Sequence, residues 1–226
     1  MYPSTRKVRS NGRTVVGHVS STKKAGVQFE SSLEEGFLYI LHFDSDVTCF
    51  HDQPLQIKYK DSEGVSRRYT PDFLVEYNNR NNVLFEVKSK EFVEKHKKEL
   101  DPVFKAARHF ALMKGWNFEI VTDQEIKTEY CENARSLFRY QTYFVELEVS
   151  NKVMDTLSRI GTSTPNLLLD EISSNDNQRA IYIAAIWTLV LNKKIECNLF
   201  TGINMETPIS ISQNGKVKEL KYPYYK

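Results

Sequence analysis

The chain has 226 residues, of which 40% are hydrophobic and 27% charged, and its formal net charge is +2. This length and composition are typical of a folded globular protein with one large or two small domains, and they exclude a disordered or fibrous chain. The longest apolar run, residues 180–191, is too short to span a bilayer, and the polar, basic N-terminus carries no apolar segment typical of a secretion signal. We therefore expect a protein that stays inside the cell.

Cysteine usage argues against a disulfide-stabilised or zinc-binding protein. The three cysteines, Cys49, Cys131 and Cys197, are odd in number and far apart in the sequence. None belongs to a Cys-x-x-Cys motif or has the histidine spacing of a zinc site. We interpret all three as packing thiols.

The first part of the chain alternates between strand and turn signals after one helix. Residues 1–25 are rich in glycine, serine and basic side chains without periodicity, which predicts an extended basic arm. Apolar residues at helical spacing predict an amphipathic helix over residues 29–43. Strands are then predicted at residues 47–50, 55–59, 69–77 and 83–87, with turns at 61–64 and 78–82.

A long helical segment is predicted over residues 91–113, with Pro102 in a position to kink or divide it. A buried strand at residues 118–121 follows, and then a helix that begins at Asp123 and runs to Phe138. This order of helix, strands, helix and strand predicts an α/β domain with a mixed sheet and helices on its faces.

The composition shifts after about residue 143. Helices are predicted over residues 146–160, from Thr164-Pro165 onward, and over residues 177–193, followed by two strands at 195–200 and 208–211. Three helices and a two-stranded wing are typical of a winged helix-turn-helix, which binds DNA. A helical appendage with no partner role is the alternative interpretation.

The residues with the clearest chemical meaning lie in two predicted strands. Asp72 follows Thr70-Pro71 at the start of one strand, and the next strand ends in Glu86-Val87-Lys88. Side chains two apart on a strand point to the same face, so Glu86 and Lys88 stand side by side. If the two strands pair antiparallel, Asp72 lies beside them at the sheet end away from the connecting turn. Two carboxylates and a lysine then share one pocket.

Such a pocket suits hydrolysis of a phosphodiester. Carboxylate oxygens bind Mg²⁺, for which Mn²⁺ is a substitute, and the metal activates water and neutralises charge in the transition state. Lys88 would orient the attacking water or stabilise charge at the phosphate. A structural ion pair is the alternative interpretation. The position of Asp72 in an apolar strand favours the site, because charges are rarely placed there without a partner or a metal.

The first predicted helix supplies a further acid. Glu30 and Glu34 lie on or beside its apolar stripe, whereas Glu35 points toward solvent. Glu34 is the best candidate for a third metal ligand, with a surface glutamate at the edge of the stripe as the alternative. The predicted catalytic residues are Glu34, Asp72, Glu86 and Lys88, the first three as metal ligands.

This pattern resembles that of restriction-endonuclease-like nucleases of the PD-(D/E)xK superfamily. A closer resemblance is to the TnsA family, the endonuclease subunit of heteromeric, Tn7-like transposases. It is carried by residues 29–41, Gln53-Pro54, Tyr69 to Val75 and Glu86 to Lys88. The resemblance implies a restriction-endonuclease-like catalytic domain over residues 26–143 and a winged-helix-like domain over residues 144–226, after the arm of residues 1–25.

The resemblance also implies an activity and partners. TnsA-like proteins are Mg²⁺-dependent DNA endonucleases that cut the 5′ (non-transferred) strand at transposon ends, which implies a prokaryotic, cytoplasmic protein. The implied partners are double-stranded DNA, a DDE-type transposase (TnsB-like) and an AAA+ regulator (TnsC-like). Glu34, Asp72 and Lys88 match the family's catalytic positions, Glu86 matches the second metal-binding position of the wider pattern, and Gln53 is a candidate for active-site support.

Two alternatives stay open at this point. One is a stand-alone restriction- or repair-type nuclease of the same fold, and the other is a DNA- or partner-binding module whose nuclease site is silent. Basic side chains gather near the N-terminus, over residues 88–98 and over residues 216–226, where they are candidates to meet DNA phosphates. The candidate DNA contacts are Lys90, Lys97, Lys98, Arg6 and Lys7.

Overall fold

The computed structural model describes residues 17–21, 24–61, 63–172 and 176–212. The predictions for Arg6, Lys7 and the basic tail lie outside these residues. Contacts divide the chain into two compact units, Met1–Thr128 and Glu129–Lys226. The sequence placed this division after residue 143. The structure places it earlier because helix α5 (Glu129–Phe138) packs against a helix of the second unit, α8 (Asp176–Leu191).

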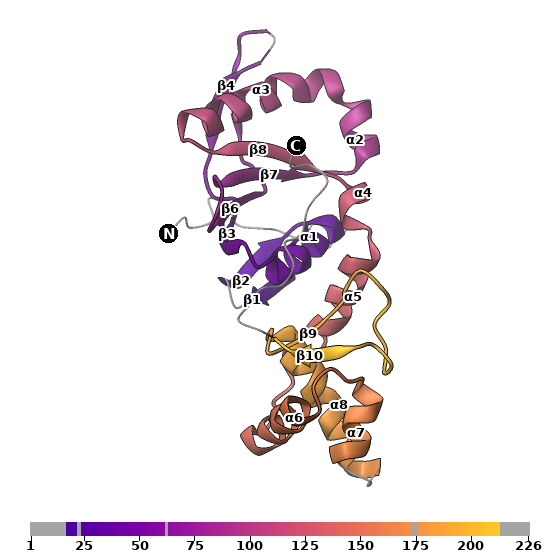
Figure 1. Ribbon diagram of the computed structural model, residues 1–226. Coiled ribbons are helices and arrows are strands. Elements are labelled where there is room, and N and C mark those ends of the chain that lie inside the picture. The colour runs from indigo at the N-terminus through magenta and orange to yellow at the C-terminus, as the bar shows by residue number, and fades with distance from the viewer. Residues whose placement is uncertain (1–16, 22–23, 62, 173–175, 213–226) are drawn as a thin grey trace. The chain divides into compact units, whose positions relative to one another are not determined.

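The first unit is built on a four-stranded mixed sheet with the strand order β3-β6-β7-β8 (Figure 1). Its strands are β3 (Val47–Asp52), β6 (Phe73–Tyr77), β7 (Val83–Val87) and β8 (Asn117–Val121). β6 is antiparallel to both of its neighbours, β3 and β7, and β8 runs parallel to β7. This is the mixed sheet that the order of helices and strands predicted, and it fits a restriction-endonuclease-like domain.

Helices cover both faces of this sheet (Figure 1). On one face, Phe37 of α1 (Ser32–Phe43) packs against Phe73 and Phe85, with ring centroids 5.8 and 5.0 Å apart. On the other, Leu74 and Leu84 belong to a buried cluster with the alanines of α3 (Lys97–Met113). Alternate side chains of a strand point to opposite faces, so β7 is buried along its whole length, Glu86 included.

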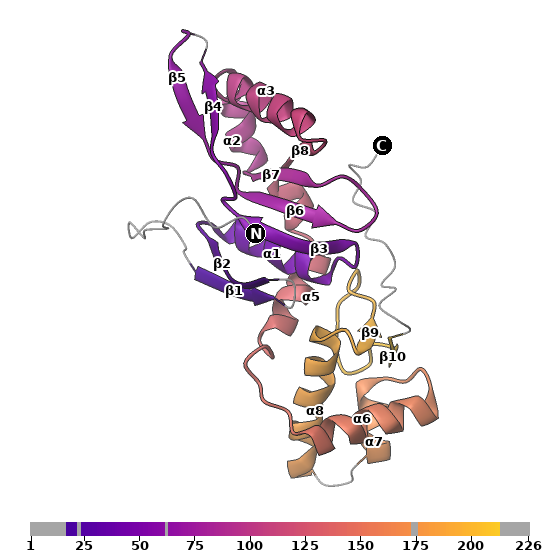
Figure 2. The same cartoon turned by 90° about the vertical axis from the view of Figure 1, so that its left-hand side faces the viewer.

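Two predicted elements are divided in the structure. The strand predicted over residues 69–77 is broken at Thr70-Pro71-Asp72, because proline has no N–H to donate to a sheet. Its first part, β5 (Ser66–Tyr69), pairs with β4 (Ile57–Lys60) in a separate two-stranded hairpin (Figure 2). The long helix is divided into α2 (Lys90–Lys95) and α3 at His96 and not at Pro102, which lies inside α3.

The segments on either side of this core also differ from the prediction. Residues Gly17–Ser21 (β1) and Lys24–Phe29 (β2) form an antiparallel hairpin where the last part of an extended arm was expected. After β8, Thr122 caps a short helix, α4 (Asp123–Ile126), through a capping box with Glu125. The single helix predicted up to Phe138 is therefore two helices, α4 and α5.

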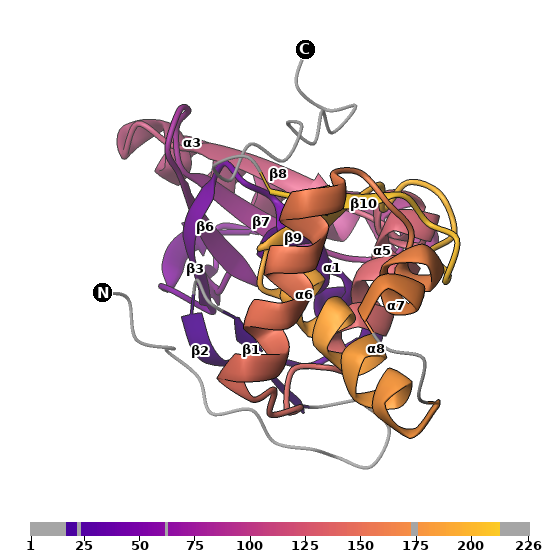
Figure 3. The ribbon, with the colours of Figure 1, turned by 60° about the horizontal axis from the view of Figure 1, so that its bottom comes forward.

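In its described residues, the second unit contains helices α5 to α8 and a small sheet (Figure 3). The helices are α6 (Leu147–Ile160), α7 (Pro165–Ile172) and α8, and β9 (Ile195–Cys197) pairs antiparallel with β10 (Ile209–Ile211). The core of this unit includes Val153, Leu157, Leu168, Leu169 and Ile186. In the described part of the chain, no helix has the length and apolar character needed to cross a membrane.

Candidate active site

Strand pairing brings the predicted strand residues together. Asp72 stands immediately before β6, and β6 pairs with β7 so that Phe73 lies opposite Phe85. One step back along β6 and one step on along β7 then set Asp72 opposite Glu86. Lys88 follows Glu86 by two residues and points to the same side. The antiparallel pairing expected from the sequence is confirmed, and the three side chains converge.

The ammonium group of Lys88 lies between the two carboxylates. Its Nζ is 2.9 Å from Oε1 of Glu86 and donates to Oδ2 of Asp72 at 3.2 Å. It also donates to the carbonyl oxygen of Val87 at 3.1 Å. Oδ2 of Asp72 accepts a second hydrogen bond, from the backbone N–H of Val87, at 2.7 Å. Two acids on adjacent strands thus hold one cation between them.

Burial dominates the electrostatics of this group. It raises the pKa of Glu86 to about 7, with the nearby charge of Asp72 adding to the rise. It also raises the pKa of Asp72 above its ordinary value, although Lys88 opposes this. Burial alone would lower the pKa of Lys88, but the charges of Asp72 and Glu86 outweigh it and raise that pKa. Lys88 is therefore a firmly charged cation in a site that resists carrying two full negative charges.

Tyr69 is a site residue that the sequence did not single out. It ends β5, and its hydroxyl donates a hydrogen bond to Oε2 of Glu86 at 2.5 Å. Burial raises the pKa of this phenol above its usual value, so the hydroxyl stays a donor. Each oxygen of Glu86 thus has a partner, Lys88 on one side and Tyr69 on the other. The only sequence signal for Tyr69 is its place three residues before Asp72.

Glu34 comes from a different element, the first turn of α1. It is buried, with 8% of its surface exposed, which is inconsistent with a surface glutamate. Its Oε2 accepts the backbone N–H of Glu30 at 2.7 Å, and its Oε1 accepts the hydroxyl of Ser31, the N-cap residue, at 3.0 Å. Burial raises the pKa of Glu34 to about 7, and the charge of Asp72 is the second cause. Glu34 is therefore within electrostatic reach of Asp72 while it caps its own helix.

Gln53 joins the strand and helix parts of the site. Its backbone N–H donates to the carbonyl oxygen of Asp72 at 2.8 Å, and its side-chain Nε2 donates to Oε1 of Glu30 at 3.0 Å. Its φ of 43° is a left-handed conformation that is uncommon for a residue other than glycine. Glu30, which the sequence set aside in favour of Glu34, lies close enough to raise the pKa of Asp72 slightly. Support by Gln53 therefore runs through Glu30 and the backbone of Asp72.

Comparison with known families agrees with this geometry. Residues 44–123 match the family model described as the TnsA-like endonuclease N-terminal domain. The chain is similar to these endonucleases over this segment of its first unit. The matched segment runs from the end of α1 to the start of α4, so it contains Gln53, Asp72, Glu86 and Lys88, whereas Glu34 precedes it. In a comparison with curated proteins, none matches the chain.

Asp72, Glu86 and Glu34 are the candidate metal ligands of the first unit. Among the residues that the structure describes, no three histidine, cysteine, aspartate or glutamate side chains are grouped so that they could hold a metal ion. The reason is visible in the contacts, since the Lys88 ammonium lies between Asp72 and Glu86 and the oxygens of Glu34 are bonded at its helix terminus. The donor chemistry nevertheless fits Mg²⁺, because buried carboxylates from adjacent strands already hold a cationic group.

The lysines predicted to contact DNA lie on α2 and α3. Lys90 begins α2, where its backbone N–H donates to Oδ1 of Asp123 at 2.7 Å and its Nζ donates to Gln124 at 3.3 Å. Lys97 and Lys98 are exposed at the start of α3. None of the three contacts the Asp72, Glu86 and Lys88 group in the described part of the chain.

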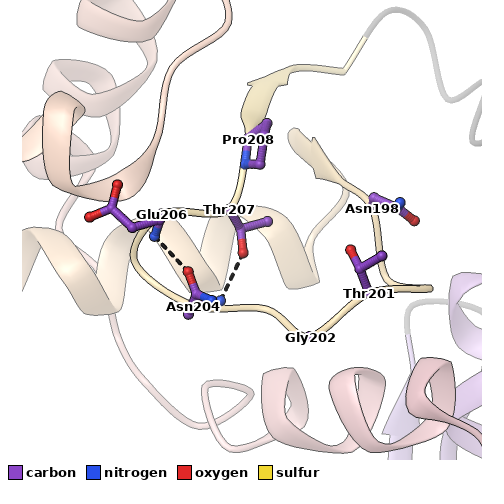
Figure 4. Close-up of a pocket in the computed structure, with 7 residues that line it drawn as sticks. All are labelled: Asn198, Thr201, Gly202, Asn204, Glu206, Thr207 and Pro208. Atoms are coloured by element: carbon purple, nitrogen blue, oxygen red, sulfur yellow. Dashed lines mark hydrogen bonds between the residues drawn. The ribbon is translucent and has the colours of Figure 1, made fainter.

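A cavity of about 370 Å³ lies in the second unit, in the segment between β9 and β10 (Figure 4). Its lining residues are Asn198, Thr201, Gly202, Asn204, Glu206, Thr207 and Pro208. The side-chain oxygen of Asn204 accepts the backbone N–H of Glu206 at 2.7 Å, and the backbone N–H of Asn204 donates to the hydroxyl of Thr207 at 2.8 Å. These bonds close the loop on itself, and the lining carries one charged side chain. The catalytic candidates Glu34, Asp72, Glu86 and Lys88, by contrast, all lie in the first unit.

Proposed function

We propose that this chain is the metal-dependent DNA endonuclease subunit of a heteromeric transposase, and that it cuts the 5′ (non-transferred) strand at transposon ends. The observation that carries the proposal is the Lys88 ammonium between Asp72 and Glu86, on adjacent strands of a TnsA-like endonuclease domain. Two acids that can hold a divalent metal ion, with a lysine between them, suit hydrolysis of a phosphodiester, because the metal and the ammonium group both offset the negative charge of the phosphate.

Asp72 and Glu86, with Glu34, would hold the metal ion. Bound Mg²⁺, or Mn²⁺ in its place, would supply an activated water and neutralise charge on the phosphate. Tyr69 keeps Glu86 in place by its hydrogen bond to Oε2. The backbone N–H of Val87 does the same for Asp72. Rigid support of this kind matters, because catalytic groups act only when they are held near their working positions.

Lys88 would act on the phosphate itself. Its raised pKa keeps the side chain charged at neutral pH, and its Nζ already reaches the two oxygens that face it. A phosphate oxygen of the scissile group is a third acceptor of the same kind. A fixed cation at this point stabilises the negative charge that develops as the bond breaks.

The proposed partners are double-stranded DNA at the transposon ends, a DDE-type transposase (TnsB-like) and an AAA+ regulator (TnsC-like). Three helices followed by a two-stranded antiparallel sheet, α6 to β10, support a winged-helix role for the second unit in binding DNA. The exposed lysines Lys90, Lys97 and Lys98 are further candidates for phosphate contact.

The test is strand cleavage by the full chain on a duplex that carries a transposon end, with and without its transposase partner and with Mg²⁺, Mn²⁺ or EDTA. We expect a nick on the 5′ strand alone, dependent on both the metal and the partner, and absent in Asp72→Asn. Cleavage at an equal rate without the partner would assign the chain to stand-alone nucleases. No cleavage by the wild type with partner and metal would contradict the proposal.

A second candidate, a DNA- or partner-binding module with a silent site, is favoured by one observation. No three acidic, histidine or cysteine side chains among the described residues are grouped as metal ligands, and Lys88 neutralises the two acids that do meet. Calorimetric titration with Mn²⁺ separates the two candidates. A silent module would show no binding that depends on Asp72, whereas an endonuclease would lose its metal binding in Asp72→Asn.

A further inference from the structure

The hairpin of β4 and β5 projects beyond the four-stranded sheet of the first unit (Figure 2). Its two strands pair with Lys58 opposite Arg68 and Lys60 opposite Ser66. Because side chains alternate along a strand, these four residues share one face of the hairpin. The other face is the inner one. It carries Ile57, which is buried in the core, and Tyr69, whose hydroxyl bonds to Glu86.

The outer face of the hairpin carries three basic side chains, Lys58, Lys60 and Arg68, beside the neutral Ser66. All three side chains are exposed, and no acidic residue shares the face. In the part of the chain that the structure describes, none of the three forms an ion pair. Like charges directly opposite each other in a hairpin are destabilising, so the Lys58 and Arg68 pair has no structural benefit to explain it.

The inner face shows how a basic residue of this hairpin is otherwise neutralised. Arg67 lies there, and its Nε is 2.9 Å from Oδ2 of Asp61, whose other oxygen, Oδ1, accepts backbone N–H groups of the turn. The same hairpin therefore carries one paired arginine on one face and three cations without acidic partners on the other. This asymmetry points to an external anion for the outer face.

The outer face is also close to the catalytic residues. Arg68 precedes Asp72 by four residues, which limits the distance between their Cα atoms to about 14 Å. Tyr69, the next residue, is tied to Glu86 by its hydroxyl. A duplex is wider than this distance and carries a negative charge about every 1.7 Å along its axis. DNA bound with a phosphate at Lys88 therefore has further phosphates within reach of the hairpin.

We propose that Lys58, Lys60 and Arg68 bind the phosphate backbone of the DNA duplex next to the cut, and that the hairpin positions the scissile phosphate by this contact. The inference rests on the proposed function, since it assumes a DNA substrate. A two-stranded ribbon also matches the width of a major groove. The lysines of α2 and α3 fit this role less well, because Glu91, Glu94 and Glu99 lie among them on the same helices.

The test is equilibrium binding of the full chain to a duplex of about 30 base pairs, without divalent metal so that no strand is cut. The variant carries Lys58→Gln, Lys60→Gln and Arg68→Gln together. The matched control is Arg67→Gln, on the opposite face of the same hairpin. Fluorescence anisotropy is measured between about 50 and 200 mM salt, because the slope of log Kd against log salt counts phosphate contacts.

We expect the triple variant to bind at least tenfold more weakly at about 50 mM salt, with a slope smaller by about 2–3, which corresponds to three lost phosphate contacts. Arg67→Gln should bind like the wild type. Equal affinity and slope for the triple variant and the wild type would overturn the inference and leave the face to a protein partner. The thermal unfolding temperature of the triple variant should be unchanged or slightly higher, because the substitutions remove a repulsive pair from exposed positions.

A second measurement uses the wild type alone. Lysine acetylation followed by mass spectrometry should show Lys58 and Lys60 protected by duplex DNA, with Lys105, which pairs with Asp101 on α3, as the unprotected reference. Equal modification with and without DNA would contradict the proposal. Binding and cleavage are read separately here. If the wild type cuts no DNA but the triple variant loses DNA binding, the hairpin contact is supported and the nuclease function is rejected. If the wild type cuts DNA and the triple variant binds and cuts normally, the nuclease function is supported and the hairpin contact is rejected.

Discussion

The strand part and the helix part of the site differ in what neutralises their charges. Asp72 and Glu86 lie on adjacent strands and are neutralised by a third side chain, Lys88, held by the same two strands. Glu34 lies on α1 and is held by its own helix terminus, through Ser31 and the N–H of Glu30. The strand group is preorganised around a cation. Glu34, by contrast, needs no cation to be stable. Mutations in the two parts of the site are therefore expected to have different effects.

The largest effect is expected from Asp72→Asn. The amide keeps an oxygen to accept the N–H of Val87 but removes the charge that Lys88 and a metal ion need. We expect cleavage to fall by roughly 10³-fold or more, with thermal unfolding close to that of the wild type. A quantitative nicking assay with the transposase partner measures the first and circular dichroism the second. Wild-type cutting by this variant would remove Asp72 from the site.

Lys88→Met tests the strand part of the site in the opposite way, because it removes the cation and leaves the two acids in place. We expect cleavage to fall by about 10²–10³-fold, as when one charge-stabilising donor is lost from an active site. Divalent metal should bind at least as tightly as in the wild type, because the ammonium no longer competes for Asp72 and Glu86. Calorimetry with Mn²⁺ tests this. Weaker metal binding in Lys88→Met would show that the lysine organises the acids and does not compete with the metal.

Glu34→Gln tests the helix part through pH. The folded protein holds a proton on Glu34 up to a pKa of about 7, whereas the unfolded chain releases it near 4.5. Between these values the folded state binds more protons, so the free energy of unfolding falls as the pH rises from about 4.5 to 7. The loss is on the order of 2–3 kcal/mol for this group. Urea unfolding in EDTA at pH 5 and pH 7.5 measures it, and the glutamine variant should lose less.

A pH response in Glu34→Gln equal to that of the wild type would contradict this account of the helix part. It would place the proton on Glu86, whose pKa is also about 7, and leave Glu34 as a charged cap of α1. Glu35→Gln on the same helix turn is the matched control. Its carboxylate accepts a hydrogen bond from Tyr39 outside the site.

Tyr69→Phe is expected to have the smallest effect of the four. It removes one donor from Glu86 and leaves the ion pair with Lys88 in place. A lost hydrogen bond to a charged group costs about 1.5–3 kcal/mol, so cleavage should fall by about 10- to 100-fold. Tyr59→Phe, on the inner face of the same hairpin, is the control. Equal rates for both variants would mean that Lys88 alone positions Glu86.

The convergence of Asp72, Glu86 and Lys88 was predictable from the sequence because it depends on two short-range rules. Side chains alternate along a strand, and a five-residue turn between two apolar segments favours an antiparallel pair. Three of the four stretches that carry the family resemblance, these strand residues among them, lie in the matched segment, residues 44–123. The alternation of side chains and the pairing of two strands across a short turn depend on residues close together in the sequence, so the spacing of those residues is enough to predict both.

Only the tertiary structure decided the contacts between elements distant in the sequence. The sequence did not predict the separate β4–β5 hairpin that results from the break at Pro71. It also did not predict the hydrogen bonds of Tyr69 with Glu86 and of Gln53 with Glu30, because the spacing of these residues carries no periodic signal. The same is true of the burial that raises the pKa of Glu34 and of the packing of α5 on α8. Burial and long-range hydrogen bonds depend on which surfaces meet, and that is settled by packing of the whole domain and not by any local pattern.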